Sequence, residues 1–243
     1  SRNWRPNVLA FTPLPVSSPW VLLLARAISC NRGLVTLASV VPQTLESQMA
    51  RVDELHDTLE RCAERFRMSA VVRVQPAADS WTGVRELVRT YGFGPLVPNT
   101  VLVGAPTGND TLAFGSLVMD LARLHRNLVA IREPRSSDFD AGGESPIRID
   151  VWWRGQNANG AFMLALACLV QRGARSWKTQ LRLCQIVGKG ESVSASTRVL
   201  EEFSHKARIE AEVLVVEGDG RTFAEQISEV SADADAACIS LRR

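Results

Sequence analysis

The sequence contains no closely spaced cysteine pair. Its five cysteines are Cys30, Cys62, Cys168, Cys184 and Cys238. They lie far apart among apolar neighbours, whereas zinc sites use short spacings such as C-x-x-C. We therefore expect five reduced, unpaired thiols and no metal site.

Histidine is also scarce. The three histidines, His56, His125 and His205, each lie in a predicted helix among charged residues. None has a second ligand at a spacing that recurs in another segment, as a site built from several segments would need. This pattern favours solvated helix faces over metal ligands.

Lysine is rare, and the many arginines are interleaved with Asp and Glu at a net charge of +2. A nucleic-acid-binding protein would gather its cations in one patch, so no nucleic-acid partner is expected. The longest apolar run, Ala161–Val170, is much shorter than the roughly 20 residues that span a bilayer. We expect no membrane insertion of this chain.

The chain opens with Ser1-Arg2-Asn3-Trp4, without Met and without an apolar leader. We expect a piece of a longer polypeptide, and no signal peptide is visible in this sequence.

Recognisable catalytic motifs are missing as well, since neither a G-x-S-x-G elbow nor a Walker loop occurs. The serine-rich stretch Glu191–Thr197 precedes a predicted helix and is interpreted as its cap and loop. Asp150 is flanked by apolar residues but has no recognisable partner acid or base, so an arginine-paired structural carboxylate is favoured over a catalyst. We predict no catalytic residue and no enzymatic activity.

The remaining sequence alternates strand and helix patterns over 243 residues, enough for one large domain or two small ones. The first predicted strands are Pro6–Phe11, Leu34–Val41, Ala70–Val74, Thr100–Val103 and Leu128–Ile131. The helices between them are Ser18–Gly33, Thr44–Arg67, Gly83–Tyr91 and Thr111–Arg126. The apolar stripe of the long second helix fits packing on a sheet better than a coiled coil.

A loop rich in Ser, Asp, Gly and Pro (Ser136–Pro146) precedes a second run of the same alternation. Its strands are Ile147–Trp153, Gln180–Val187, Ala211–Val216 and Ala236–Leu241, and its helices are Ala161–Gln171, Ser194–Arg208 and Thr222–Val230. Such alternation predicts an α/β fold with two consecutive parallel-sheet units flanked by helices. The units are residues 1–135 and 147–243, joined by a linker at 136–146.

One glycine-containing stretch is a candidate for binding phosphate. The strand Thr100–Val103 runs into Gly104, Gly108 follows, and the next helix contains Gly115 and Ser116. This layout resembles in element order the ATP site of the universal stress protein fold, where glycines and a helix N-terminus meet the phosphates. The spacing departs from that motif, because three residues rather than two separate the first glycines. A tight strand–helix connection is therefore favoured, and weak ATP binding is the alternative.

Several stretches together resemble the cytosolic C-terminal domain of the cation-chloride cotransporters, the sodium-potassium-chloride and potassium-chloride carriers. These stretches are Asn3–Leu9, Gly92–Gly94 with Pro98–Gly104, Ile149–Trp153 and Arg175–Lys178. The I-D-V-W-W strand and the P-N-T segment are the most specific of them. The short Asp138–Ser145 loop, where eukaryotic members carry a long regulatory insertion, indicates a prokaryotic-type member and argues against regulation by phosphorylation.

The resemblance implies a non-catalytic, non-conducting regulatory and dimerising domain on the cytoplasmic side of the cell membrane. Its partners would be a second copy and the membrane domain of the same polypeptide. A stand-alone nucleotide-binding module like a universal stress protein is the alternative interpretation. An enzyme with an unrecognised site is the third.

Overall fold

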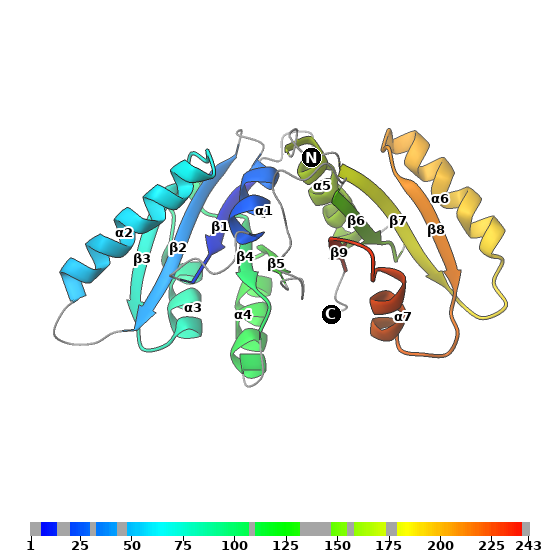
Figure 1. The fold of residues 1–243 in the computed structure, drawn as a ribbon. Helices are drawn as coiled ribbons and strands as arrows, with labels where there is room; N and C mark the ends of the chain where they lie inside the picture. The colour runs from blue at the N-terminus through cyan, green and yellow to red at the C-terminus, as the bar shows by residue number, and fades with distance from the viewer. Residues whose placement is uncertain are drawn as a thin grey trace. The chain divides into compact units, whose positions relative to one another are not determined.

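The computed structural model describes residues 6–13, 20–29, 33–42, 48–106, 110–131, 147–154, 158–173 and 179–239. The chain divides into two compact units, Ser1–Arg135 and Ser136–Arg243. Each contains one parallel sheet flanked by helices (Figure 1), so the predicted α/β class is confirmed. The predicted linker, residues 136–146, lies outside the described residues.

Unit 1 has a five-stranded parallel sheet in the order β3-β2-β1-β4-β5. Its strands are β1 (Asn7–Phe11), β2 (Leu34–Pro42), β3 (Val71–Ala77), β4 (Thr100–Gly104) and β5 (Asn127–Ile131). Its helices are α1 (Trp20–Ser29), α2 (Gln48–Arg65), α3 (Ser80–Thr90) and α4 (Thr111–Arg123), with a 3-10 turn, η1 (Gly94–Leu96), before β4.

Helices cover both faces of this sheet. Apolar side chains of α3 and α4 form a core with Leu9, Phe11, Val101 and others from one sheet face. Helix α1 packs on β1, β2 and β4, and α2 packs on β3 through the buried Leu59. The described part of the long helix therefore packs on a sheet, as its apolar stripe predicts.

Unit 2 has a four-stranded parallel sheet in the order β8-β7-β6-β9. Its strands are β6 (Ile147–Trp152), β7 (Thr179–Val187), β8 (Glu212–Glu217) and β9 (Ala236–Cys238), and its helices are α5 (Ala158–Gly173), α6 (Val193–Ala207) and α7 (Phe223–Val230). Helix α7 packs over Trp152 and Cys184, while α5 and α6 pack on β6, β7 and β8. As predicted, Trp153 (7% exposed) is more buried than Arg148 (32%).

Two of the helix boundaries that differ from the predictions have clear local reasons. Helix α3 begins three residues before Gly83, because the Asp79 carboxylate caps it by accepting from the Thr82 backbone N–H (2.9 Å). Helix α4 ends at Arg123 instead of Arg126, because the chain leaves helical geometry at Leu124 and His125 has a left-handed φ of 53°.

The serine-rich stretch also differs from its prediction. Ser192 is the N-cap of α6 and accepts from the Ala195 N–H (3.2 Å), so the predicted cap is right. The predicted loop is wrong from Val193 onward, because those residues already form the first turns of α6. No helix in the described ranges is long and apolar enough to cross a membrane.

Candidate functional site

The carboxyl end of the unit 1 sheet is where its topology would place a ligand. The chain leaves β1 toward β2 and β3 on one side and toward β4 and β5 on the other. In open parallel sheets, ligands bind outside the carboxyl ends of the strands at such a reversal. Gly104, the last residue of β4, lies at this end and is exposed.

Packing and conformation do not explain why glycine occupies position 104. A Cβ added there would meet no atom within 4 Å, and φ lies outside the left-handed region that favours glycine. A glycine that the fold itself does not require is consistent with room for a ligand. Gly108 lies outside the described residues.

Gly115 and Ser116 lie in the second turn of α4 and not at the carboxyl end of the strands. A Cβ at Gly115 would also meet open space. The Ser116 hydroxyl donates to the Leu112 carbonyl oxygen of its own helix (3.1 Å). Asp110 precedes α4 without a capping hydrogen bond, and a carboxylate at that point disfavours an incoming phosphate. The described residues thus bring only Gly104 to the predicted site, and ATP binding stays a prediction.

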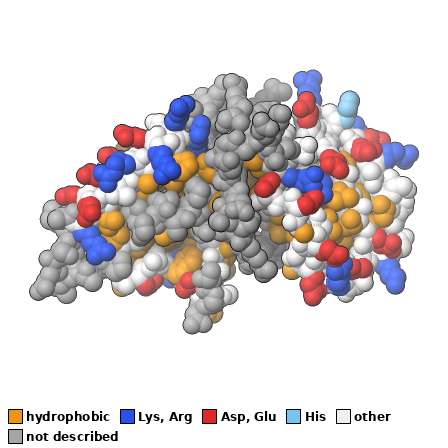
Figure 2. All heavy atoms as spheres, in the orientation of Figure 1, with side chains coloured by type: hydrophobic (Ala, Val, Ile, Leu, Met, Phe, Trp, Pro, Cys, Tyr) orange, Lys and Arg blue, Asp and Glu red, His pale blue; other side chains and the backbone are white. Residues whose placement is uncertain are grey.

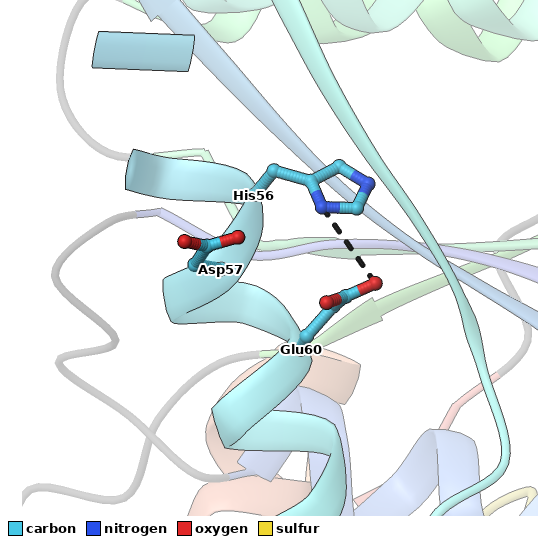
Figure 3. A group of neighbouring side chains, drawn as sticks. All are labelled: His56, Asp57 and Glu60. Atoms are coloured by element: carbon cyan, nitrogen blue, oxygen red, sulfur yellow. Dashed lines mark ion pairs between the residues drawn. The ribbon is translucent and has the colours of Figure 1, made fainter. Parts of the chain in front are cut away.

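A second group of polar side chains lies on α2, where His56, Asp57 and Glu60 place possible ligand atoms within 4.8 Å of one another. Figure 3 shows all three on neighbouring turns of this helix, with His56 Nδ1 and a Glu60 oxygen 3.7 Å apart. Both acids are exposed and all three residues come from one helix. Ligand sets of this kind are common on polar surface helices, where water solvates them, and no metal site is assigned. Because the three residues lie in one segment, a requirement for ligands from separate segments does not identify them.

The most extensive buried polar network of the described residues is in unit 2, around Asp150. Asp150 is fully buried in β6, beside Arg182 of β7 in the strand register. Arg182 donates from Nε to Asp150 Oδ1 (2.8 Å) and from Nη2 to Oδ2 (2.6 Å). The predicted arginine partner of Asp150 is therefore Arg182.

The same network hydrogen-bonds the segment after α7 to the sheet. The Ser231 hydroxyl donates to Asp150 Oδ2 (2.6 Å) and accepts from Trp152 Nε1 (3.0 Å). Arg182 also donates to the Val230 carbonyl oxygen (3.0 Å). Asp150 and Arg182 thus each have several hydrogen-bond partners within the fold, as is typical of a structural network. Arg182 could be identified from the sequence as the isolated charge between Leu181 and Leu183. No pattern in the sequence points to Ser231.

Burial near this network keeps two thiols protonated. Desolvation, and secondarily the Asp150 charge, raises the pKa of Cys184 to about 12 and that of Cys238 to about 11. Cys62, Cys168, Cys184 and Cys238 form no disulfide among the described residues, as predicted, and Cys30 lies outside those residues. None of this favours a nucleophilic cysteine.

Comparison with known proteins rests on structure, because no protein-family model matches the chain. The cytoplasmic domain of a prokaryotic cation chloride cotransporter superposes with a TM-score of 0.65 at 13% identity, covering 89% of this chain and 80% of that one. The fold is universal-stress-protein-like. A universal stress protein from Archaeoglobus fulgidus DSM 4304 gives a TM-score of 0.53 at 14% identity, covering 95% and 84%.

A protein of unknown function from Pseudomonas aeruginosa PAO1 gives a TM-score of 0.56 at 10% identity, covering 95% of this chain and 79% of that one. At these identities the three likenesses establish the fold. One of the three structures is a cotransporter domain, the same kind of protein that the sequence motifs resemble.

Proposed function

We propose that this chain is a cytosolic regulatory and dimerisation domain of a membrane cation-chloride cotransporter, and that it neither catalyses a reaction nor conducts ions. The observation that carries the proposal is the likeness to the cytoplasmic domain of a prokaryotic cotransporter over 89% of the chain. The sequence resemblance supports it independently, because its motifs were identified without the fold.

The motif residues occupy positions where they hold the fold together. Asp150 and Trp152 belong to the buried network of unit 2. Gly92 has a φ of +92°, and a Cβ there would lie 2.8 Å from the Leu96 carbonyl oxygen. Thr100 is fully buried at the start of β4. These residues explain why a domain of this architecture would retain such motifs.

The first test is the coding sequence upstream of this chain. A carrier needs about a dozen apolar spans of roughly 20 residues each. Finding them in the same reading frame supports the proposal, and a complete gene without them contradicts it. In the intact carrier, removing this domain should change the rate or control of chloride-dependent cation uptake but not the choice of ions.

The second test concerns dimerisation. Sedimentation of the chain from low to high micromolar loading should show a monomer–dimer shift, with an interface near the lower end for specific complexes, about 1,200 Å². In the carrier, tethering two copies would raise their effective concentration, so the isolated contact can be weak. A purely monomeric chain at the highest loading would contradict this part of the proposal.

A stand-alone nucleotide-binding module is the alternative, and the unexplained glycine at position 104 is the observation that favours it. Calorimetric titration with ATP of the wild type and of Gly104→Val tests it, because valine at this open position leaves the fold intact. Gly115→Val, on the outer side of α4, is the matched control. Binding that is lost only in Gly104→Val would support a nucleotide site, and equal binding by all three would remove Gly104 from it.

A further inference from the structure

One end of unit 1 collects exposed apolar side chains. Because its five strands are parallel (Figure 1), the strand starts and the ends of the preceding helices share one end of the sheet. Of the nine large hydrophobic residues that are exposed in the described part of the chain, five lie at this end. They are Leu34, Val71, Phe93, Leu96 and Leu124. We call the surface formed by these residues and their neighbouring connections the amino-end face.

Phe93 is the most exposed of the five, at 76%, and a stiff turn presents it. Gly92 and Gly94 have positive φ values of 92° and 51°. Leu96 N–H closes the η1 turn on the Phe93 carbonyl oxygen (3.0 Å), and Pro95 fixes one φ within it. An aromatic side chain held into solvent by such a turn is a typical contact point for a partner surface.

The amino-end face also lacks acids. The connections and strand starts at residues 65–73, 89–99 and 123–131 contain arginines but no Asp or Glu. Arg65, Arg67 and Arg123 are exposed there. Within the described ranges, none of these three has an ion-pair partner. Figure 2 shows hydrophobic side chains reaching the surface of unit 1 beside Arg side chains.

The helix dipole does not account for this charge distribution. Cations at helix C-termini are favoured in any α/β unit, yet two of the corresponding connections of unit 2 also contain acids. Residues 206–213, after α6, contain two Glu beside Lys206 and Arg208, and residues 230–238, after α7, contain two Asp and no Lys or Arg. The connection after α5, residues 174–178, lies outside the described residues. The combination of unpaired arginines and exposed apolar side chains therefore belongs to the amino-end face of unit 1.

We propose that the amino-end face binds the surface of a lipid bilayer that contains anionic headgroups. Phe93 enters the headgroup region, while Arg65, Arg67 and Arg123 pair with lipid phosphate and carboxylate groups. The contact is peripheral, and no helix inserts. This proposal rests on the proposed function in one respect: a domain of a membrane carrier would lie beside a lipid bilayer.

Charge complementarity favours a membrane over a protein partner. The strands lie about 4.8 Å apart, so the five-stranded sheet is roughly 20 Å wide. Arg65 and Arg67 precede β3 at one edge of the sheet, and Arg123 precedes β5 at the other. Cations spread this widely around a central aromatic side chain suit a fluid anionic surface, whose headgroups rearrange to meet them. The connections at residues 65–73, 89–99 and 123–131 contain no Asp or Glu with which a second copy could complete these pairs.

Vesicle cosedimentation of the full chain tests the proposal. We expect binding to phosphatidylcholine–phosphatidylserine vesicles, weakened by salt, and little binding to phosphatidylcholine alone. Changing Arg65, Arg67 and Arg123 to Gln should weaken binding about fivefold for each arginine. Phe93→Ser should weaken it about tenfold. Each altered side chain is exposed, and circular dichroism checks that the variants fold.

The matched control is the double variant Arg198→Gln/Val199→Ser on α6, where Val199 is 66% exposed. It removes an exposed cation and an exposed apolar side chain from unit 2 and should bind like the wild type. Equal binding to both vesicle types, or a triple arginine variant that binds like the control, would overturn the proposal. A change in sedimentation of Phe93→Ser without vesicles would overturn it in favour of a contact between protein copies. The upstream coding sequence tests the carrier assignment independently of all these outcomes.

Discussion

Replacing Asp150 by Asn is the most direct test of the unit 2 network. Asparagine keeps the size of the side chain but removes the charge that faces Arg182. The Arg182 side chain is only 11% exposed, and its hydrogen bonds to Asp150 hold the pKa of Arg182 above the usual value. Because an arginine keeps its charge in proteins even without such a partner, the guanidinium would stay charged when Asp150 is replaced.

The expected loss is about 3 kcal/mol of unfolding free energy. Removing one member of a buried ion pair costs roughly 3–5 kcal/mol. Asp233, which is 60% exposed, lies 3.3 Å from Arg182 and can take over part of the role. The lower end of the range is therefore the appropriate one.

Two matched variants set the scale. Asp120→Asn breaks a pair in unit 1 whose arginines, Arg85 and Arg89, are 32% and 51% exposed. Their charges stay hydrated, so a loss of about 1–2 kcal/mol is expected. Glu202→Gln, in an exposed pair with Lys206, should change stability by less than about 0.5 kcal/mol.

Urea denaturation measures these differences, and hydrogen exchange by mass spectrometry assigns them to a unit, because the chain divides into two. Asp150→Asn should speed exchange in β6 and β7 and leave β1 and β4 unchanged. Adding Arg182→Met should restore much of the loss, since the unpaired charge is then gone. The reasoning is wrong if Asp150→Asn costs no more than Glu202→Gln, or if the double variant is less stable than Asp150→Asn.

Three further predictions follow from single residues. Hydrogen bonds from Arg85, and then from Arg89, lower the pKa of Asp120 below its usual value of about 3.9. The stability that the ionised Asp120 contributes is therefore fully present above that value, and it is lost as the pH falls through the pKa of the folded state. Acid denaturation of unit 1 should show this loss, and Asp120→Asn should lack it. Thiol titration at pH 8 should find Cys184 and Cys238 slow in the native protein and five thiols after denaturation; fewer than five would reveal a disulfide. Gly83→Ala should destabilise by about 1–3 kcal/mol because its Cβ would lie 2.4 Å from Val40. Gly115→Ala, in open space on α4, should stabilise by about 0.5–1 kcal/mol, and the opposite order in thermal melts would contradict this packing.

Periodicity was sufficient to predict the architecture from the sequence. Alternating apolar patterns of strand and helix length predicted both sheets, since covering each apolar face requires helices on both sides. The pairing of Asp150 with an arginine was also predictable, because an isolated charge in a buried strand needs a partner. Helix boundaries were harder to predict, because a single capping hydrogen bond, such as the one that Asp79 accepts, shifts the start of a helix by about a turn.

Only the tertiary structure shows the partners of Asp150 and the amino-end face, because both depend on which distant residues come into contact. The partner of Asp150 is 32 positions away at Arg182, and Ser231 is 81 positions away; only the strand order and the path after α7 bring them together. The same holds for the amino-end face. Leu34, Phe93 and Leu124 have no common pattern in the sequence, but parallel strands bring their connections to one end of the sheet. Local patterns determine which elements form, whereas the order of the strands determines which side chains share a surface.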